Sequence, residues 1–196
     1  MNKLVLYGAG GHAKVIAELA ELNYYEELTF CEDEPTKKQI WNYPIVAKIG
    51  NKEKCVIAIG NNAVRKKLAI VLKNAFVTLI HPQSQISTRA MIGNGTVIMA
   101  GVTINTDAQV GNHCIVNTNA SIDHDCIIED FVHLSPNVAL AGTVSIGEGT
   151  HIGVGACVIQ GIKVGKWCTI GAGAVIIRDV PDGCTVVGNP GRIIKK

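Results

Sequence analysis

The chain has 196 residues and a formal net charge of +2, from 18 Lys and Arg against 16 Asp and Glu. This length fits one domain, or a small domain joined to a repeat array, and the balanced charge argues against a nucleic-acid partner, which requires a clustered basic excess. Apolar runs too short to span a bilayer argue against membrane insertion, and seven cysteines with no CxxC pair and no secretory leader predict a reduced, cytoplasmic protein.

The first strand of the chain is followed by a glycine-rich turn. Residues 3–7 are an apolar strand, Gly8-Ala9-Gly10-Gly11-His12 is the turn, and a helix is expected from there to about Leu22. Such a turn lets backbone amides and the helix N-terminus approach a phosphate, because glycines remove steric obstruction and the helix dipole favours negative charge. A tight connection without a ligand is the alternative for this motif alone.

Two further strand ends are expected at the same crevice. A strand near residues 28–31 ends in Glu32-Asp33, where a Rossmann-like unit places acidic groups near a ribose or base. The run 55–59 predicts a third strand, which ends in Gly60-Asn61-Asn62. We expect a helix over about 63–74, with the basic run Arg65-Lys66-Lys67 on its solvated face. A strand at 76–80 and a domain boundary near residue 82 complete this α/β unit.

From Ile86 onward the chain repeats every six residues. Every sixth position from Ile86 to Ile176 is Ile, Leu or Val, and a second register four residues later holds mostly small residues. Gly often follows the aliphatic residue, as at Gly93 and Gly147, which suits a tight corner with unusual backbone angles. Short strands wound around one axis place one large and one small side chain inside each hexad, so the pattern predicts a solenoid.

The hexads resemble those of the hexapeptide-repeat acyltransferases, which follow an aliphatic-Gly-x-x-small-x pattern. This resemblance covers about residues 86–177 and implies a left-handed parallel β-helix with three hexads to a coil. Together with the GAGGH turn, the AIGNN strand end and the LIHP junction, the chain resembles the sialic acid O-acetyltransferase-like family of bacterial amino-sugar acetyltransferases, including its PglD-like N-acetyltransferases. The expected fold is an α/β Rossmann-like domain (1–82) followed by an all-β left-handed parallel β-helix (83–196).

The resemblance implies acetyl-CoA as cosubstrate, no metal, and N-acetylation of a UDP- or dTDP-linked 4-amino-dideoxy sugar by a homotrimer with active sites between subunits. Some relatives carry Ser or another small residue at the position of Gly10 and a pair of aspartates at Glu32-Asp33, which leaves the nucleotide and the sugar open. The residues that match the family's nucleotide-sugar positions are Gly10, Gly11, His12, Glu32, Asp33, Ile57, Gly60 and Asn61. Those that match its coenzyme positions are His133, Gly142, Val154 and Ala172.

His124 is the candidate general base. It stands two residues after the inward Ile122, so its side chain is expected to point outward, where the adjacent Asp125 can hold one tautomer and raise its basicity. A solvated surface histidine is the alternative on spacing alone. The family's Asn-Thr-x-Ala-x-Ile-x-His-[Asp or Glu]-Cys pattern matches residues 117–126 and implies His124 as base and Asp125 as its partner. Cys126 occupies the small inward register and is expected to pack rather than react.

Other functions remain open at this point. His133 and His151 are 18 residues apart and would stack, which raises a γ-carbonic-anhydrase-like zinc protein, although that class has a different histidine spacing. Sugar or sialic acid O-acetylation is the rival chemistry, and a noncatalytic β-helix assembly protein is the rival class. The C-terminal Arg192, Lys195 and Lys196 either assist the coenzyme's phosphates or form a frayed tail.

Overall fold

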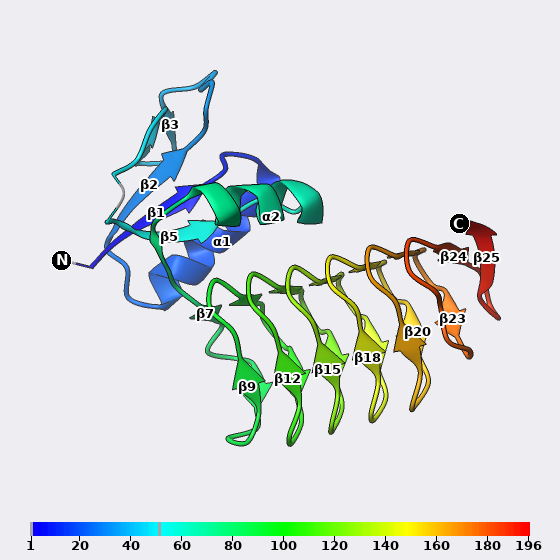
Figure 1. Ribbon diagram of the computed structural model, residues 1–196. Coiled ribbons are helices and arrows are strands. Elements are labelled where there is room, and N and C mark those ends of the chain that lie inside the picture. Colours follow the sequence, from blue (N-terminus) through cyan, green and yellow to red (C-terminus); the bar gives the residue numbers. More distant parts are fainter. Residues whose placement is uncertain (1, 51) are drawn as a thin grey trace.

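The computed structural model describes residues 2–50 and 52–196 and contains an α/β domain that sits over the first coils of a long solenoid (Figure 1). The C-terminal strands lie at the far end of the solenoid from the α/β domain (Figure 1). Neither helix within the described ranges is long and apolar enough to cross a membrane.

A six-stranded sheet forms the centre of the α/β domain, in the order β3-β4-β2-β1-β5-β6. Every neighbouring pair except β3 with β4 is parallel, so β1, β2 and β5 end at one edge of the sheet, as the Rossmann-like prediction requires. The elements are β1 (Lys3–Tyr7), α1 (Gly11–Leu22), β2 (Glu27–Cys31), β3 (Gln39–Ile40), β4 (Tyr43–Val46), β5 (Lys54–Ile57), α2 (Asn62–Val71) and β6 (Ala75–Phe76).

The solenoid has three parallel sheets, whose strands alternate along the chain. The first sheet contains β7 (Leu79–Ile80), β10 (Val97–Ile98), β13 (Ile115–Val116), β16 (His133–Leu134), β19 (His151–Ile152), β22 (Thr169–Ile170), β24 (Thr185–Val187) and the antiparallel β25 (Arg192–Lys195). The second contains β8 (Gln85–Ile86), β11 (Thr103–Ile104), β14 (Ser121–Ile122), β17 (Ala139–Leu140), β20 (Cys157–Val158) and β23 (Val175–Ile176). The third contains β9 (Met91–Ile92), β12 (Gln109–Val110), β15 (Ile127–Ile128), β18 (Ser145–Ile146) and β21 (Lys163–Val164).

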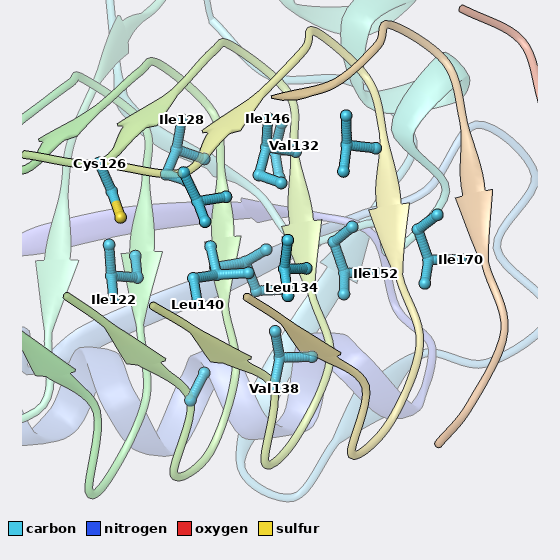
Figure 2. Close-up of a cluster of buried hydrophobic side chains, with 14 of the residues drawn as sticks. Ile122, Cys126, Ile128, Val132, Leu134, Val138, Leu140, Ile146, Ile152 and Ile170 are labelled. Atoms are coloured by element: carbon cyan, nitrogen blue, oxygen red, sulfur yellow. The ribbon is translucent and has the colours of Figure 1, made fainter. Parts of the chain in front are cut away.

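The interior of the solenoid is built from the two predicted registers. Val116 pairs with Leu134, and Leu134 with Ile152, so each strand lies beside the strand 18 residues further on and three hexads make one coil. Figure 2 shows Ile122 and Leu140 pointing into this core together with Cys126 from the small register. All three are at most 2% exposed, so the large and small side chains interlock without contact with water.

The hexad glycines have a different role from the predicted one. Positive φ angles occur three residues after the aliphatic position, for example at Gly95 (φ 69°) and Asp125 (φ 58°), and not at Gly93 or Gly147. A Cβ on Gly93 would lie 2.5 Å from the carbonyl carbon of the glycine one coil further on, and a Cβ on Gly147 would lie 2.6 Å from its counterpart. These glycines are therefore required by the close approach of successive coils, and the expectation of unusual backbone angles at them was wrong.

The junction between the two parts is tighter than the sequence indicated. The single strand expected at 76–80 is two strands, because β6 completes the α/β sheet while β7 already pairs with β10 of the solenoid. The first solenoid strand thus begins before residue 82. Outward-facing Val97 and Ile115 of the first sheet belong to the same buried cluster as Ile16 and Leu19 of α1. The α/β domain and the first coils consequently share one core.

Candidate functional site

A cavity of about 890 Å³ lies at the carboxyl ends of β1, β2 and β5. Six of the eight predicted nucleotide-sugar residues line it: Gly10, Gly11, His12, Glu32, Asp33 and Gly60. Ile57 is buried within β5, and Asn61 caps α2 by accepting the backbone N–H of Val64 at 3.0 Å. Asn61 faces a smaller cavity of about 240 Å³ between α2 and the solenoid. The structure therefore does not bring Ile57 and Asn61 to the main cavity.

Several residues of this cavity were not predicted from the sequence. Tyr7, the last residue of β1, donates its hydroxyl to the Asp33 carboxylate at 2.5 Å. Burial and this carboxylate raise the pKa of Tyr7 far above its ordinary value, so the phenol stays protonated and fixes the orientation of Asp33. Glu34 adds a third carboxylate after β2, and Lys67 of α2 adds a cation.

His12 sits in the first turn of α1 at the edge of the cavity. Its Nε2 is buried and has no hydrogen-bond partner in the described chain. Burial, with a smaller contribution from the positive charge of Arg65, lowers the pKa of His12 to about 4, so the ring is neutral at pH 7. A buried polar nitrogen without a partner is costly in a folded protein, and at the wall of a cavity a bound ligand can supply the missing contact.

The outward face of the first sheet changes from apolar residues to histidines along the solenoid axis. Val97 and Ile115 are apolar where α1 covers them, and the next residues in the same column are His133 and His151. The two rings stack with centroids 4.9 Å apart, as their spacing predicted. Burial, followed by His151, Arg65 and His12, lowers the pKa of His133 to about 3, while a hydrogen bond with the Gly60 backbone opposes this shift. His133 is therefore neutral, and its partner Gly60 lines the 890 Å³ cavity.

The described residues contain no group of three His, Cys, Asp or Glu side chains that could hold a metal ion. The other partners of the histidine stack are neutral hydrogen-bonding groups. The Ser135 hydroxyl lies 2.8 Å from His151 Nε2, and the Asn117 amide nitrogen lies 3.4 Å from His133 Nε2.

His124 lies at another corner of the solenoid, in the turn between β14 of the second sheet and β15 of the third. Its side chain is 52% exposed, and its Nδ1 is 2.8 Å from the Asp125 carboxylate. This hydrogen bond is the main reason that the pKa of His124 is raised. A Cβ on Gly142 would lie 2.5 Å from His124 Nε2, so the free nitrogen occupies space that only a glycine leaves open. The outward, carboxylate-paired histidine expected from the sequence is present.

The predicted coenzyme residues fall into three places on one chain. His133 is on the first sheet, whereas Gly142 lies beside His124 at the corner between the second and third sheets. Val154 and Ala172 lie at the corner between the first and second sheets, where the Gly173 N–H donates to the Val154 carbonyl at 2.8 Å. Within one chain, Gly142 therefore lies next to His124, and Val154 lies next to Ala172 at a different corner.

Two expectations about individual side chains have opposite outcomes. Cys126 is buried, and its thiol donates to the Ala141 carbonyl at 3.2 Å while burial raises its pKa, which confirms a packing role. The prediction of a solvated face for the basic run was wrong for Arg65 and Lys66, whereas Lys67 is exposed. Arg65 is 1% exposed, Lys66 forms an ion pair with Glu148 across the domain junction, and Lys67 lines the cavity. Arg65 and Lys66 thus contact the solenoid, whereas Lys67 does not.

The α/β domain has a match among known families. The PglD N-terminal domain family matches residues 3–72. UDP-N-acetylbacillosamine N-acetyltransferase from Bacillus subtilis (strain 168) is 44% identical over 113 residues, which are 51% of this chain and 52% of that protein. The match thus spans about half the length of this curated relative.

Solved structures match the whole chain. The acetyltransferase domain of PglB from Neisseria gonorrhoeae FA1090 has a TM-score of 0.93 at 39% identity, covering 99% of this chain and 100% of that one, and its complex with acetyl coenzyme A matches at 40% identity. A histidine mutant of GDP-perosamine N-acetyl transferase from Caulobacter crescentus, in complex with CoA and GDP-perosamine, has a TM-score of 0.91 at 34% identity, covering 100% and 98%. These matches confirm the fold expected from the hexads and the glycine-rich turn. The chain belongs to the PglD-like family of hexapeptide-repeat acetyltransferases.

Proposed function

We propose that this protein transfers an acetyl group from acetyl-CoA to the amino group of a UDP- or dTDP-linked 4-amino-dideoxy sugar. The observation that carries the proposal is the His124–Asp125 pair, whose free Nε2 faces the space above Gly142. The names of the similar proteins, which include acetyltransferases of bacillosamine and perosamine nucleotides, support the same chemistry.

In the proposed reaction the sugar's amine attacks the thioester carbonyl directly. His124 Nε2 accepts the proton that the nitrogen loses as the C–N bond forms, and it returns this proton to the thiolate when the C–S bond breaks. The products are an amide and coenzyme A with a free thiol. Asp125 keeps Nδ1 protonated and stabilises the positive ring between the two transfers. We assign the backbone amides near Gly142 to the developing oxyanion, where fixed donors have the largest effect.

The nucleotide is assigned to the 890 Å³ cavity. Gly10 and Gly11 at the start of α1 leave room for a diphosphate beside the positive end of the helix. Glu32 and Asp33 follow β2, where carboxylates accept hydrogen bonds from a ribose or base. This arrangement directs the sugar away from the acidic end and toward the glycine-rich turn, His12 and the first solenoid sheet.

The three separate places of the predicted residues support a homotrimer. The nucleotide cavity belongs to the side of the first sheet, whereas His124 lies at the corner between the other two sheets. A sugar bound to one chain therefore meets the His124 of a neighbouring copy. The same neighbour relation brings Val154 and Ala172 of one chain opposite Gly142 of the next, which provides a groove for the coenzyme. We place the enzyme in the cytoplasm, where its free cysteines stay reduced.

The test uses purified full-length protein, acetyl-CoA and a panel of acceptors: UDP-, dTDP- and GDP-linked 4-amino-dideoxy sugars, and free sialic acid. Release of coenzyme thiol is followed in time, and the product's acetyl linkage is identified by mass spectrometry and NMR. Amide formation on a UDP or dTDP sugar supports the proposal. Turnover on the GDP sugar alone would correct the nucleotide, and an ester on sialic acid would replace N- by O-acetylation. Absence of thiol release with every acceptor would refute the activity.

A further inference from the structure

Arg65 of α2 is the largest fully buried side chain in the described protein, and it reaches across the domain junction. Its Nε donates to the His113 carbonyl at 2.7 Å, and its Nη2 donates to the Phe131 carbonyl at 2.8 Å. Both carbonyls belong to the solenoid corner between the third and first sheets. On the other side, Nη1 donates to the carbonyls of Ile59 and Gly60 at 3.0 and 3.2 Å. One planar group thus connects the end of β5 with two coils.

The guanidinium is held entirely by neutral groups. Its remaining N–H donates to the Asn62 side-chain oxygen at 2.8 Å, so the acceptors equal the five donors of an arginine in number. Burial lowers the pKa of Arg65 to about 10, which leaves it charged at neutral pH. We call the planar Arg65 guanidinium with its five neutral acceptors the fork. Only an arginine can form it, because a lysine has three donors on a single atom and cannot reach acceptors on both sides.

The residues on the near side of this fork belong to the nucleotide cavity. Ile59 and Gly60 line it, and the Gly60 backbone is also the hydrogen-bond partner of His133 on the first sheet. Asn62 adds a second connection, because its amide nitrogen donates to the carbonyls of Gly149 and Thr150 at 3.0 and 3.3 Å. A displacement of the Arg65 side chain would therefore move a wall of the cavity relative to the solenoid.

We propose that Arg65 is a positioning residue, which places the bound nucleotide sugar relative to the acetyl-transfer corner by fixing the Ile59-Gly60 wall to the solenoid. This inference rests on the proposed function. A positioning role can be distinguished from a purely stabilising one. A folded protein without the fork should still bind the nucleotide and coenzyme A normally, yet it should transfer the acetyl group slowly.

The test compares Arg65→Lys with wild type at a temperature at which circular dichroism shows both to be folded. We expect kcat/KM for the best nucleotide sugar of the panel to fall at least tenfold, because misplacement by about 1 Å can cost about a hundredfold in rate. The Kd values of free UDP and of coenzyme A should change by less than about threefold, since each is held mainly by one domain. A folded Arg65→Lys protein with kcat/KM within about twofold of wild type would overturn the proposal.

The matched control is Lys66→Met, which removes the ion pair with Glu148 at the same junction. Both partners are partly exposed, so kcat/KM should stay within about twofold of wild type. If Arg65→Lys does not fold, Asn62→Ala takes its place, since it removes one acceptor of the fork and the contacts with Gly149 and Thr150. We expect that variant to lose roughly threefold in kcat/KM, and a wild-type value in folded protein would count against the proposal.

Hydrogen exchange separates this inference from the proposed function. If wild type acetylates none of the acceptors, the proposed function fails, and the role of Arg65 is then judged by amide exchange. Loss of the fork should accelerate exchange in residues 58–64 and leave residues 139–146, which lie on the second and third sheets away from α2, unchanged. Identical exchange over 58–64 in wild type and Arg65→Lys would show that Arg65 does not hold this wall.

Discussion

Two corners of the same solenoid carry histidines with opposite properties. His113 lies at the corner between the third and first sheets, which α2 covers, and it is 8% exposed between Phe76 and Phe131. Burial lowers its pKa to about 4. His124 lies at the bare corner, where the hydrogen bond that its Nδ1 donates to the Asp125 carboxylate raises the pKa instead. The two histidines occupy neighbouring positions of the hexad, since His113 stands three residues after Val110 with a φ of 53° and His124 stands two residues after Ile122. Their surroundings separate them further, because His113 is enclosed beside α2 whereas the His124 side chain is 52% exposed.

The largest effect that tests this contrast is expected from His124→Ala. Without the base, kcat should fall by two or more orders of magnitude, while thermal unfolding stays close to wild type because the side chain is half exposed. Steady-state thiol release and a calorimetric scan measure both quantities. The matched substitution at the covered corner, His113→Phe, should leave kcat nearly unchanged. A His124→Ala enzyme with wild-type turnover would remove this residue from the mechanism.

Gly142→Ala tests the space around the base. The added Cβ would lie 2.5 Å from His124 Nε2, so the exposed ring must turn away from its position above the corner. We expect kcat to fall by roughly ten- to a hundredfold with little change in stability, because the base remains but is displaced. Gln160→Ala, at the same corner one coil further on, is the control. Equal rates for the two variants would show that the closeness of Gly142 to His124 has no catalytic importance.

Asp125→Asn tests the carboxylate and gives a smaller effect, about tenfold in kcat, since the base itself is retained. The sign of the pH effect follows from the raised pKa of His124. The wild-type rate should be lost as pH falls through that raised pKa, because the base must be neutral. Removal of the carboxylate lowers the pKa toward its ordinary 6.5 and should shift this acid limb to lower pH. Asp107→Asn, at the equivalent position one coil earlier, should shift nothing.

The difference between the corners also marks the limit of sequence-based prediction. The hexad registers identify the interior because every large or small inward position follows from a period of six, and Cys126 was placed correctly on that basis. The outward position of His124 follows from the same count. By contrast, the covering of His113 depends on contacts with Arg65 and Phe76, which are far away in sequence. A local pattern carries no information on such docking.

The basic run illustrates this limit. Arg65, Lys66 and Lys67 look equivalent in the sequence, yet one is buried, one pairs across the junction and one faces a cavity. The direction of α2 over the solenoid decides among these roles. Similarly, Tyr7 ends an apolar strand and gave no sign of its bond to Asp33, because parallel pairing of β1 with β2 creates that neighbour relation. Resemblance indicated Gly60 but assigned Ile57 and Asn61 to a cavity that they do not line.

The smallest expected effect concerns stability in acid. The folded-state pKa of His113 is about 4 and its ordinary value is 6.5, with burial as the main cause and Arg65 adding to it against Asp130. Because the unfolded chain binds this proton first, the free energy of unfolding should fall as pH drops from 6.5 toward about 4, by at most about 1.4 kcal/mol per pH unit for this group. Urea unfolding of wild type and His113→Phe at several pH values measures the difference.

His124→Gln is the control at the bare corner, and its sign is opposite. A raised pKa contributes stability that is present below 6.5 and is lost as pH rises through the folded value. Loss of His124 should therefore make unfolding slightly more sensitive to acid, whereas loss of His113 should make it less sensitive. If the free energy of unfolding of His113→Phe and wild type depended on pH in the same way, α2 would not exclude water from His113. The difference in burial, on which the distinction between the two corners rests, would then be refuted.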